Sequence, residues 1–186
     1  MEGEIVFTGK TKQGEEYVIR YPKPGDAPAM LKYINTISKE RTFICFQGEQ
    51  LTLVEEEKVL IKQLEQIGKH EGVTLFVVAE GKIVGISQIE MKDKAAKHEG
   101  VFGISLFKEY RGEGIGKKLT QMVLEEAEKH IPQLLIVTLG VFGNNRLAME
   151  MYKKFGFVES GRLPKGVLHR DEYVDHVYMF KKLKDF

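Results

Sequence analysis

Residues 107–118 read FKEYRGEGIGKK and place three alternate glycines, Gly112, Gly114 and Gly116, between an apolar strand pattern and a helical one. Glycines let backbone amides approach an anion without a Cβ atom in the way. The first amides of a helix lack a partner within it and carry the positive end of its dipole. The stretch therefore predicts a phosphate cradle at a helix start, to which Lys117 and Lys118 add positive charge.

The spelling of this loop excludes two well-known phosphate-binding motifs. A P-loop requires GxxxxGK[ST], but Arg111 stands at its first Gly and Lys118 at its Ser or Thr. The dinucleotide fingerprint GxGxxG fails because the glycines give GxGxG, and the strands before the loop predict a meander and not a Rossmann unit. The alternative is a glycine turn that serves only as a helix entry, which the flanking Arg and Lys residues disfavour.

The apolar period changes across the loop and predicts a mixed α/β fold. β-Branched and aromatic residues before it favour an antiparallel meander with a hairpin turn at Glu80-Gly81. After it, apolar residues fall on one helical face, and a later apolar run is typical of a buried parallel strand. We expect strands at 73–79, 82–91 and about 99–107, a helix from 112 to before Pro132, a strand at 134–139, a helix capped by Asn144 or Asn145, and strands at 157–167 and 173–180.

The N-terminal part of the chain predicts one strand and two helices. The segment Tyr17–Arg20 has the composition of a strand. Asp26 is expected to cap a helix that extends to about residue 38. Thr52 and Glu55 stand three residues apart as a capping box at the start of the second helix.

Composition and charge bound the class of protein. A chain of 186 residues, of which 42% are hydrophobic, has about the length of one domain and enough apolar material for a core. The 28 Lys and Arg residues nearly balance the 27 Asp and Glu residues, so no basic excess exists for broad nucleic-acid binding. The apolar stretches are too short to span a bilayer, and the first residues do not resemble a signal peptide. We expect a cytoplasmic protein that binds neither nucleic acid nor membrane.

Histidine and cysteine usage argues against a metal site. The five histidines show no HxxxH or HExxH spacing, and the single Cys45 cannot form an internal disulfide or a thiolate cage. No nucleophile signature accompanies Cys45, so we expect a free, buried or half-buried thiol and no metal.

Two motifs around these elements occur in the order of a known family. Arg111-x-x-Gly114-x-Gly116 is similar to the RxxGxG pyrophosphate loop of the GNAT N-acetyltransferases. Downstream, the family's NxxAxxxYxxxGF motif resembles Asn145-x-x-Ala148-x-x-x-Tyr152-x-x-Phe155-Gly156-Phe157. The resemblance covers roughly residues 74–180. It implies a central, mostly antiparallel sheet, flanked by helices and splayed apart near Leu106 and Leu139 to form a slot for acetyl-CoA.

The resemblance also implies a domain organisation. We expect one N-acetyltransferase domain over residues 1–186. Residues 1–72 would supply an N-terminal strand and substrate-facing helices, and residues 73–186 the acetyl-CoA-binding core and a C-terminal hairpin.

In this family the loop amides hold the pyrophosphate of acetyl-CoA, which is a co-substrate. The resemblance implies that an amide near Leu106 polarises the thioester carbonyl and that Asn145 bonds the pantetheine arm. The cofactor-binding residues expected from it are Ile104, Ser105, Leu106, Arg111, Gly112, Glu113, Gly114, Ile115, Gly116, Lys117 and Asn145.

Tyr152 is the residue expected to carry chemistry. A CoA thiolate has the basicity of an ordinary thiol, about 8.5, and a phenol with a pKa near 10 can lend it a proton as general acid. The alternative is a core aromatic, because Tyr152 shares an apolar helix face with Ala148 and Phe155.

The general base stays open at this point. An amine acceptor with a pKa of about 10.4 must lose a proton before it attacks. Some family members use a glutamate five residues before the Asn motif, and that position is Gly140 here. Glu90, His98, Glu99 or a water molecule could take the proton, and the alternative for each side chain is a solvated hairpin residue.

The acceptor also stays open. Acidic residues would favour a cationic amine, although acidic residues at a helix start also suit its dipole. The candidate contacts are Phe43, Phe46, Glu49, Glu55 to Glu57, Tyr173 and Asp175. Free amino acids, polyamines, antibiotics and protein N-termini or lysines are all compatible with them.

We therefore expect an enzyme that transfers the acetyl group of acetyl-CoA directly to a primary amine of a small molecule or protein. One alternative is an acyltransferase for a longer group such as succinyl. Another is a CoA-binding or sensing module without turnover, which the missing glutamate at Gly140 would suit. Two-fold dimers are common in the family, but the sequence carries no self-association motif.

Overall fold

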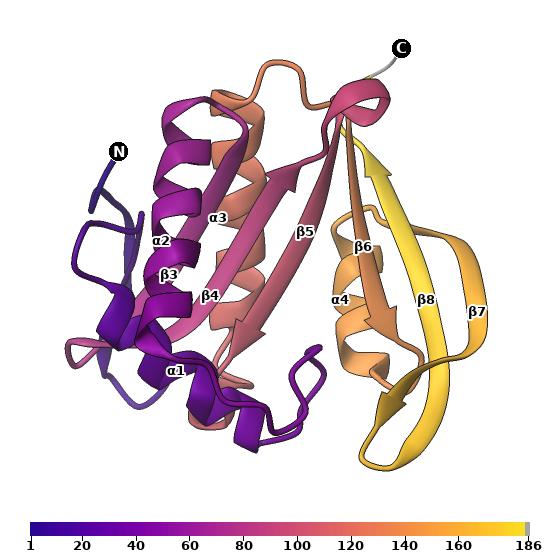
Figure 1. The fold of residues 1–186 in the computed structure, drawn as a ribbon, viewed down its shortest axis with the longest axis horizontal. Coiled ribbons are helices and arrows are strands. Elements are labelled where there is room, and N and C mark those ends of the chain that lie inside the picture. The colour runs from indigo at the N-terminus through magenta and orange to yellow at the C-terminus, as the bar shows by residue number, and fades with distance from the viewer. Residues whose placement is uncertain (185–186) are drawn as a thin grey trace.

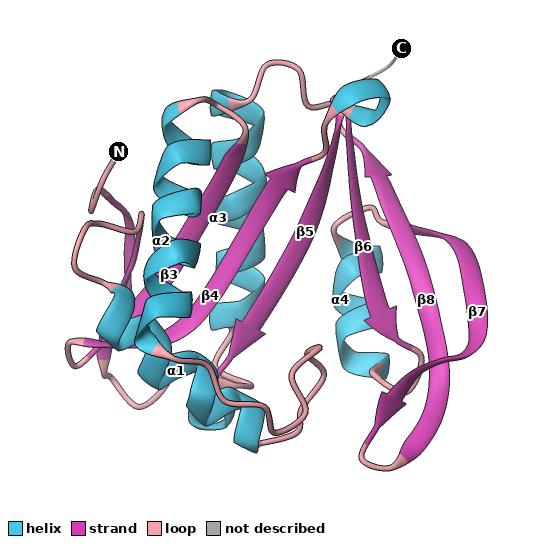
Figure 2. Ribbon diagram, viewed as in Figure 1, coloured by secondary structure: helices cyan, strands magenta, loops and turns pink. Residues whose placement is uncertain are grey.

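Within the described residues, 1–184, the computed structural model forms one sheet with helices on both faces (Figures 1 and 2). The strands are β1 (Ile5–Lys10), β2 (Glu16–Arg20), β3 (Gly72–Ala79), β4 (Lys82–Met91), β5 (Glu99–Leu106), β6 (Ile136–Phe142), β7 (Val158–His169) and β8 (Glu172–Lys182). The helices are α1 (Ala27–Lys39), α2 (Leu53–Gly68), α3 (Ile115–His130) and α4 (Arg146–Lys154), with 3-10 turns η1 (Lys94–Ala96) and η2 (Lys108–Tyr110). The strand order is β1-β2-β3-β4-β5-β6-β8-β7. This is the mixed α/β fold that the sequence predicts.

The central strand β3 is buried on both faces, so its sequence is an apolar run without polar alternation. Leu75 and Val77 belong to the core cluster that includes α3, whereas Phe76 packs in a second cluster with α1 and α2. In Figure 1, α1 and α2 lie in front of the sheet and α3 and α4 behind it. We call these the front and back faces.

The sheet splits between β5 and β6, its one parallel pair among the described strands. These strands pair only from Glu99 with Ile136 to Val101 with Thr138. Beyond that point they diverge, and Figure 1 shows the widening gap between their ends. The expected splay is therefore confirmed. Because the strands are parallel, the segments that follow both of them, which lead into α3 and α4, start at the open end.

Local signals explain where two helices begin. The Thr52 hydroxyl accepts from the Glu55 amide, and the Glu55 carboxylate accepts from the Thr52 amide at 2.8 Å. This capping box is the one that the sequence predicts. Helix α3 begins with Gly114 as its N-cap, in the left-handed region at a φ of 84°.

Several expectations were incomplete or wrong. Strand β1 was not predicted, because it is an edge strand with three exposed positions and no alternation of buried residues. Strand β6 begins two residues later than expected. Leu134 is buried, but it belongs to a turn in which its amide donates to the Ile131 carbonyl, and not to the strand. Cys45 is free but exposed, because it lies in the loop between α1 and α2.

Asp26 stands at the N-cap position of α1, but its side chain does not cap the helix. Its two oxygens instead accept from both terminal nitrogens of Arg20, at 2.7 and 2.8 Å, and one also accepts from the Lys23 amide. Both side chains of this bidentate pair are largely buried. The ion pair anchors α1 to β2.

We expect Asp26→Ala to lower the free energy of unfolding by about 3 kcal/mol, because it leaves a buried guanidinium without its partner. Asp26→Asn, which keeps an acceptor for the Lys23 amide, should cost less. Urea unfolding of both variants measures the difference. A cost below about 1 kcal/mol for the alanine variant, the range of a surface pair, would show that the ion pair does not anchor the helix.

Candidate active site

The glycine loop has the backbone geometry of an anion cradle. Gly112 and Gly114 both have positive φ angles, 80° and 84°, which other residues rarely adopt. At these two positions and at Gly116, no described atom lies within 4 Å of where a Cβ atom would stand. The glycines are therefore not needed to avoid a clash within the chain. They leave open space above the loop, as expected if a ligand approaches the backbone there.

The first turn of α3 supplies amides to this space. The Lys118 amide donates to the Gly114 carbonyl, so the amides before it precede the first bond within the helix. The Ile115 side chain is fully buried in the core, and only its backbone can serve a ligand. Lys117 is exposed on the same turn. These features fit the pyrophosphate of a CoA ester.

Two charged residues of the loop are engaged with other parts of the chain. The Glu113 carboxylate accepts from the Lys12 amide at 2.7 Å, and the Lys12 ammonium donates to the Gly112 carbonyl at 2.6 Å. Arg111 donates to the Leu106 carbonyl at 2.9 Å and pairs with Glu40 at 2.6 Å. The β1–β2 hairpin thus holds the loop through Lys12, a contact that sequence reasoning missed because β1 was not predicted.

The end of β5 presents backbone groups to the splay. The Phe107 amide donates to the Val84 carbonyl of β4 at 2.9 Å. Because successive residues of a strand direct their amides to opposite edges, those of Leu106 and Ile104 face away from β4, towards the gap. The Ser105 hydroxyl instead bonds the Tyr33 hydroxyl on the front face at 2.8 Å. The geometry brings Ile104 and Leu106, but not Ser105, to the splay.

The start of α4 lies at the same open end. Asn145 is its N-cap, and its side-chain oxygen accepts from the Ala148 amide at 3.3 Å. The side-chain amide nitrogen of Asn145 is then the group that can donate to a ligand. Helices α3 and α4 therefore both direct their N-termini to the gap between β5 and β6 (Figure 1).

Tyr152 is buried on α4, where its ring packs edge-on against Phe102 and contacts Phe157. Burial raises the pKa of Tyr152 to about 12. The phenol therefore keeps its proton at neutral pH and can act as a hydrogen-bond donor or an acid. Core packing and a role in chemistry, the two alternatives for this residue, are compatible.

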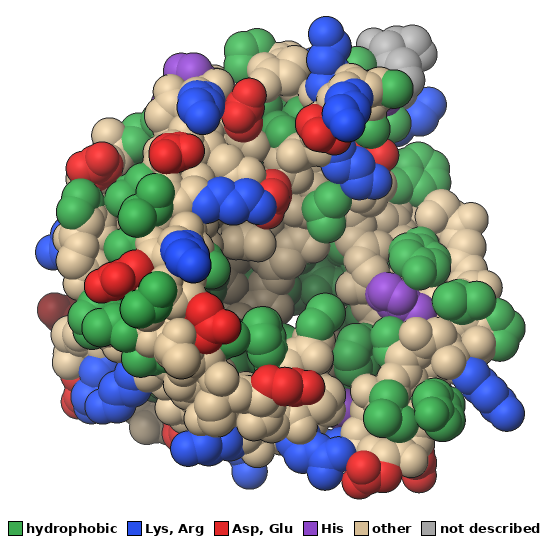
Figure 3. Space-filling view, in the orientation of Figure 1, with side chains coloured by type: hydrophobic (Ala, Val, Ile, Leu, Met, Phe, Trp, Pro, Cys, Tyr) green, Lys and Arg blue, Asp and Glu red, His purple; other side chains and the backbone are tan. Residues whose placement is uncertain are grey.

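The front face is hollowed over the same strands. A cleft of about 1110 Å³ lies over β4 and β5 beside α2, and a second of about 420 Å³ lies over β6 and β8. Both are lined by Lys92 and Val101. Figure 3 shows this hollow between the two halves of the molecule. Its floor includes Val101 and Thr138, the last residues that pair β5 with β6.

Two of the three candidate bases are ion-paired acids. Partial burial would raise the pKa of Glu90, but hydrogen bonds from Lys62 and Gln66 lower it overall. Partial burial would likewise raise the pKa of Glu99, but hydrogen bonds from Lys92 and Thr138 lower it overall. A lowered pKa makes both carboxylates weak proton acceptors. His98 precedes β5, at the end where β5 and β6 are paired.

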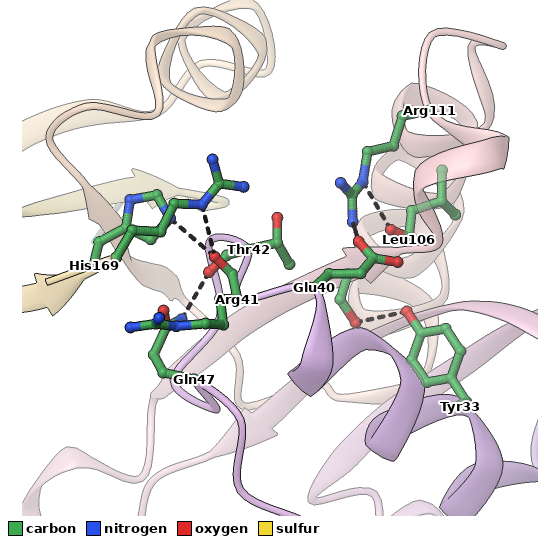
Figure 4. Close-up of polar contacts among 10 residues, drawn as sticks. Tyr33, Glu40, Arg41, Thr42, Gln47, Leu106, Arg111 and His169 are labelled. Carbon is green, nitrogen blue, oxygen red and sulfur yellow. Dashed lines mark hydrogen bonds and ion pairs between the residues drawn. The ribbon is translucent and has the colours of Figure 1, made fainter.

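Residues 40–52, which we call the linker segment, connect α1 to α2 and bridge the two halves of the sheet (Figure 4). Glu40 binds Arg111 on the β5 side. On the other side, the Arg41 carbonyl accepts from Arg170 and lies 3.2 Å from the His169 Nε2 atom. The linker segment therefore crosses the front of the splay.

The expected acceptor contacts mostly have structural partners. Phe43 packs against His169 and Phe142, and the Glu49 carboxylate accepts from the Gln47 amide. Glu55 closes the capping box, and Asp175 binds Arg162. The carboxylates of Glu49, Glu55 and Asp175 are thus engaged within the chain.

Neither a metal-binding cluster nor a membrane-spanning helix is found in the part of the chain that the structure describes. No group of three or more His, Cys, Asp or Glu residues there could hold a metal ion. No described helix is both long and apolar enough to cross a bilayer.

Comparison with known proteins gives a family. A model of the acetyltransferase (GNAT) family matches residues 35–157. The L-amino acid N-acetyltransferase AaaT of Escherichia coli is 28% identical over 117 residues, which are 62% of this chain and 72% of the relative. The spermine/spermidine N(1)-acetyltransferase of Bacillus subtilis is 28% identical over 122 residues, 61% of this chain and 76% of the relative.

Solved structures agree. A GNAT-family acetyltransferase from Streptococcus pneumoniae superposes with a TM-score of 0.82 at 29% identity, over 90% of this chain and 99% of that one. A Salmonella typhimurium protein solved with its cofactor acetyl-CoA shares the fold at 14% identity, with a TM-score of 0.77 over 91% and 95% of the two chains. From the loop, the splayed sheet and these matches together, we conclude that the chain belongs to the GNAT family of acetyltransferases.

Proposed function

We propose that this protein transfers the acetyl group of acetyl-CoA to a primary amine of a small molecule. One observation carries the proposal: the glycine cradle, the outward Leu106 amide and the start of α4 all lie at the same opening of the sheet. A ligand with a pyrophosphate at one end and a thioester at the other matches this arrangement.

Each part would have a distinct role. The amides of residues 112–117 bind the pyrophosphate, helped by the dipole of α3. Asn145 donates to the pantetheine arm. The Leu106 amide donates to the thioester oxygen and stabilises the negative charge that develops there during attack. Tyr152, which remains protonated, donates to the departing thiolate.

Small amines are the proposed acceptors. Relatives of this chain are an L-amino acid acetyltransferase and a spermine/spermidine acetyltransferase, and both substrate classes are primary amines. The front clefts, which meet at Val101, give an amine access to the splay from the side opposite to α3 and α4.

The test is an acetylation screen. The protein is incubated with acetyl-CoA and, separately, with spermidine, spermine, each L-amino acid and a lysine peptide. We expect one of the small amines to gain the mass of one acetyl group while one CoA thiol appears per product. Binding of CoA without any acetylated amine would instead support a CoA-binding module. Faster turnover with succinyl-CoA than with acetyl-CoA would support the longer acyl donor.

A further inference from the structure

We infer that His176, on β8, is the group that takes the proton from the acceptor amine. This inference rests on the proposed function and extends it to a residue that neither the sequence motifs nor the expected site includes. It is carried by the position of the imidazole over Gly140, at the point where β5 and β6 separate.

The imidazole of His176 fills the space that a side chain at Gly140 would need. A Cβ atom at Gly140 would overlap the Nε2 atom of His176 and lie 3.0 Å from its Cε1 atom. The register explains this contact, since β6 pairs Phe142 with His176 and Gly140 with Tyr178, so the ring leans diagonally across the ladder. Gly140 has no positive φ angle, so its backbone conformation does not require glycine. The absence of a side chain there instead leaves room for the imidazole.

A second glycine makes room for the same residue. A Cβ atom at Gly166, on β7, would lie 2.9 Å from the Cβ atom of His176. The ring of Tyr178 lies beside the imidazole, with centroids 4.5 Å apart. His176 is therefore held in one place by its neighbours on three strands, as a group that must meet a substrate has to be.

This place is at the head of the splay. Thr138 is the last residue of β6 to pair with β5, and Gly140 is the next residue on the same face. Successive residues on one face of a strand are about 6.6 Å apart. The half-buried imidazole therefore lines the 420 Å³ cleft about one such step beyond the last paired residues, on the β6 side of the gap that the Ile104 and Leu106 amides face from β5.

The other titratable groups of this cleft are less suited to accept a proton. Lys92 and Glu99, neighbours at the adjacent ends of β4 and β5, form an ion pair, and the pKa of Glu99 is lowered. On β8, the other titratable side chain that lines the cleft is Tyr178, and the lining residues of β6 are Thr138, Leu139 and Gly140. A neutral imidazole is a proton acceptor near neutral pH, which a phenol and an ammonium are not.

His176 accepts one proton from the ammonium of the acceptor, and the neutral nitrogen attacks the thioester carbonyl carbon. The new C–N bond forms as the C–S bond breaks, and Tyr152 protonates the departing sulfur. The nitrogen gives up its second proton, which restores Tyr152 through water. His176 releases its own proton to solvent, so each turnover yields one amide, one thiol and one proton.

The experiment compares His176→Gln with the wild type, using the amine that the wild type acetylates. We expect kcat/KM at neutral pH to fall by about 100-fold or more. The deficit should shrink as the pH approaches the pKa of the amine, about 10.4, because the amine then arrives without its extra proton. His130→Gln, on the far end of α3, is the matched control and should retain full activity.

A double variant that moves the proton acceptor from position 176 to position 140 separates a chemical role from a packing role. Gly140→Ala alone should lower activity, since its Cβ atom displaces the imidazole. His176→Ala combined with Gly140→Glu removes that clash and puts a carboxylate into the same space. We expect the double variant to recover activity over His176→Ala by about 10-fold or more, a gain that a purely structural histidine would not allow.

Two readouts do not depend on turnover. Calorimetry with CoA should give the same affinity for His176→Gln and the wild type. In the CoA complex, the His176 imidazole resonance, assigned by its loss in the variant, should shift when the amine is added. Full activity in His176→Gln, or a deficit that does not change with pH, would overturn the inference while leaving the proposed function intact. A wild type that acetylates no amine would overturn both.

Discussion

Replacing Gly114 by aspartate lowers the affinity for CoA by about 100-fold or more. The new carboxylate would stand at the first turn of α3, in the open space where the pyrophosphate is expected. Two like charges about 4 Å apart repel by about 4 kcal/mol near a protein surface, and each 1.4 kcal/mol is a factor of ten in affinity. Calorimetric titration with CoA measures the loss.

Gly114→Asn is the matched control for this change. Asparagine has nearly the same shape as aspartate, and both tolerate the left-handed conformation that Gly114 adopts. We expect the asparagine variant to lose affinity through bulk alone and to bind CoA more tightly than the aspartate variant. Equal affinity of the aspartate variant and the wild type would remove the pyrophosphate from this loop.

Replacing Tyr152 by phenylalanine lowers kcat/KM by about 100- to 10,000-fold, the range for a lost general acid. The phenyl ring keeps the contacts with Phe102 and Phe157, so the free energy of unfolding should change by less than about 1 kcal/mol. Tyr17→Phe, a buried tyrosine on β2, is the control and should keep its activity. Unchanged turnover in Tyr152→Phe would leave Tyr152 with a packing role only.

The pKa of Tyr152 gives the same residue a pH signature. Its pKa in the folded protein, about 12, lies above the ordinary value of about 10, so the neutral phenol is favoured by folding. Its contribution to stability is complete below about pH 10 and is lost as the pH rises towards 12. An ultraviolet difference titration of wild type against Tyr152→Phe should show almost no phenolate from this residue at about pH 10, where a phenol with the ordinary pKa would be half ionised.

Most of the fold could be predicted from periodicity and local signals, and the parts that could not depend on tertiary contacts. The capping box at Thr52 and the apolar run of β3 are local, and both gave correct elements. Strand β1 has no strong pattern of its own and is specified by pairing with β2. The N-cap prediction at Asp26 was right about position and wrong about the side chain, because Arg20 competes for its oxygens.

The candidate site divides in the same way. The glycine loop and the Asn145 cap are each formed by a short stretch of sequence, so both motifs could be recognised directly. The contacts of Lys12 with the loop and of Glu40 with Arg111 join residues far apart in the chain. His176 could be found only from the register of β6 and β8, although a glycine inside an apolar strand was a signal that something approaches closely there.

The most direct test of the CoA position is a map of backbone amide resonances. Nitrogen-labelled protein is titrated with CoA, and the shift of each assigned amide is followed. We expect the largest changes at residues 112–117 and at Leu106, with smaller ones at Asn145, because these groups face the opening of the splay. Large changes confined to other parts of the chain, with the loop amides and Leu106 unmoved, would contradict the placement of the cofactor between β5 and β6.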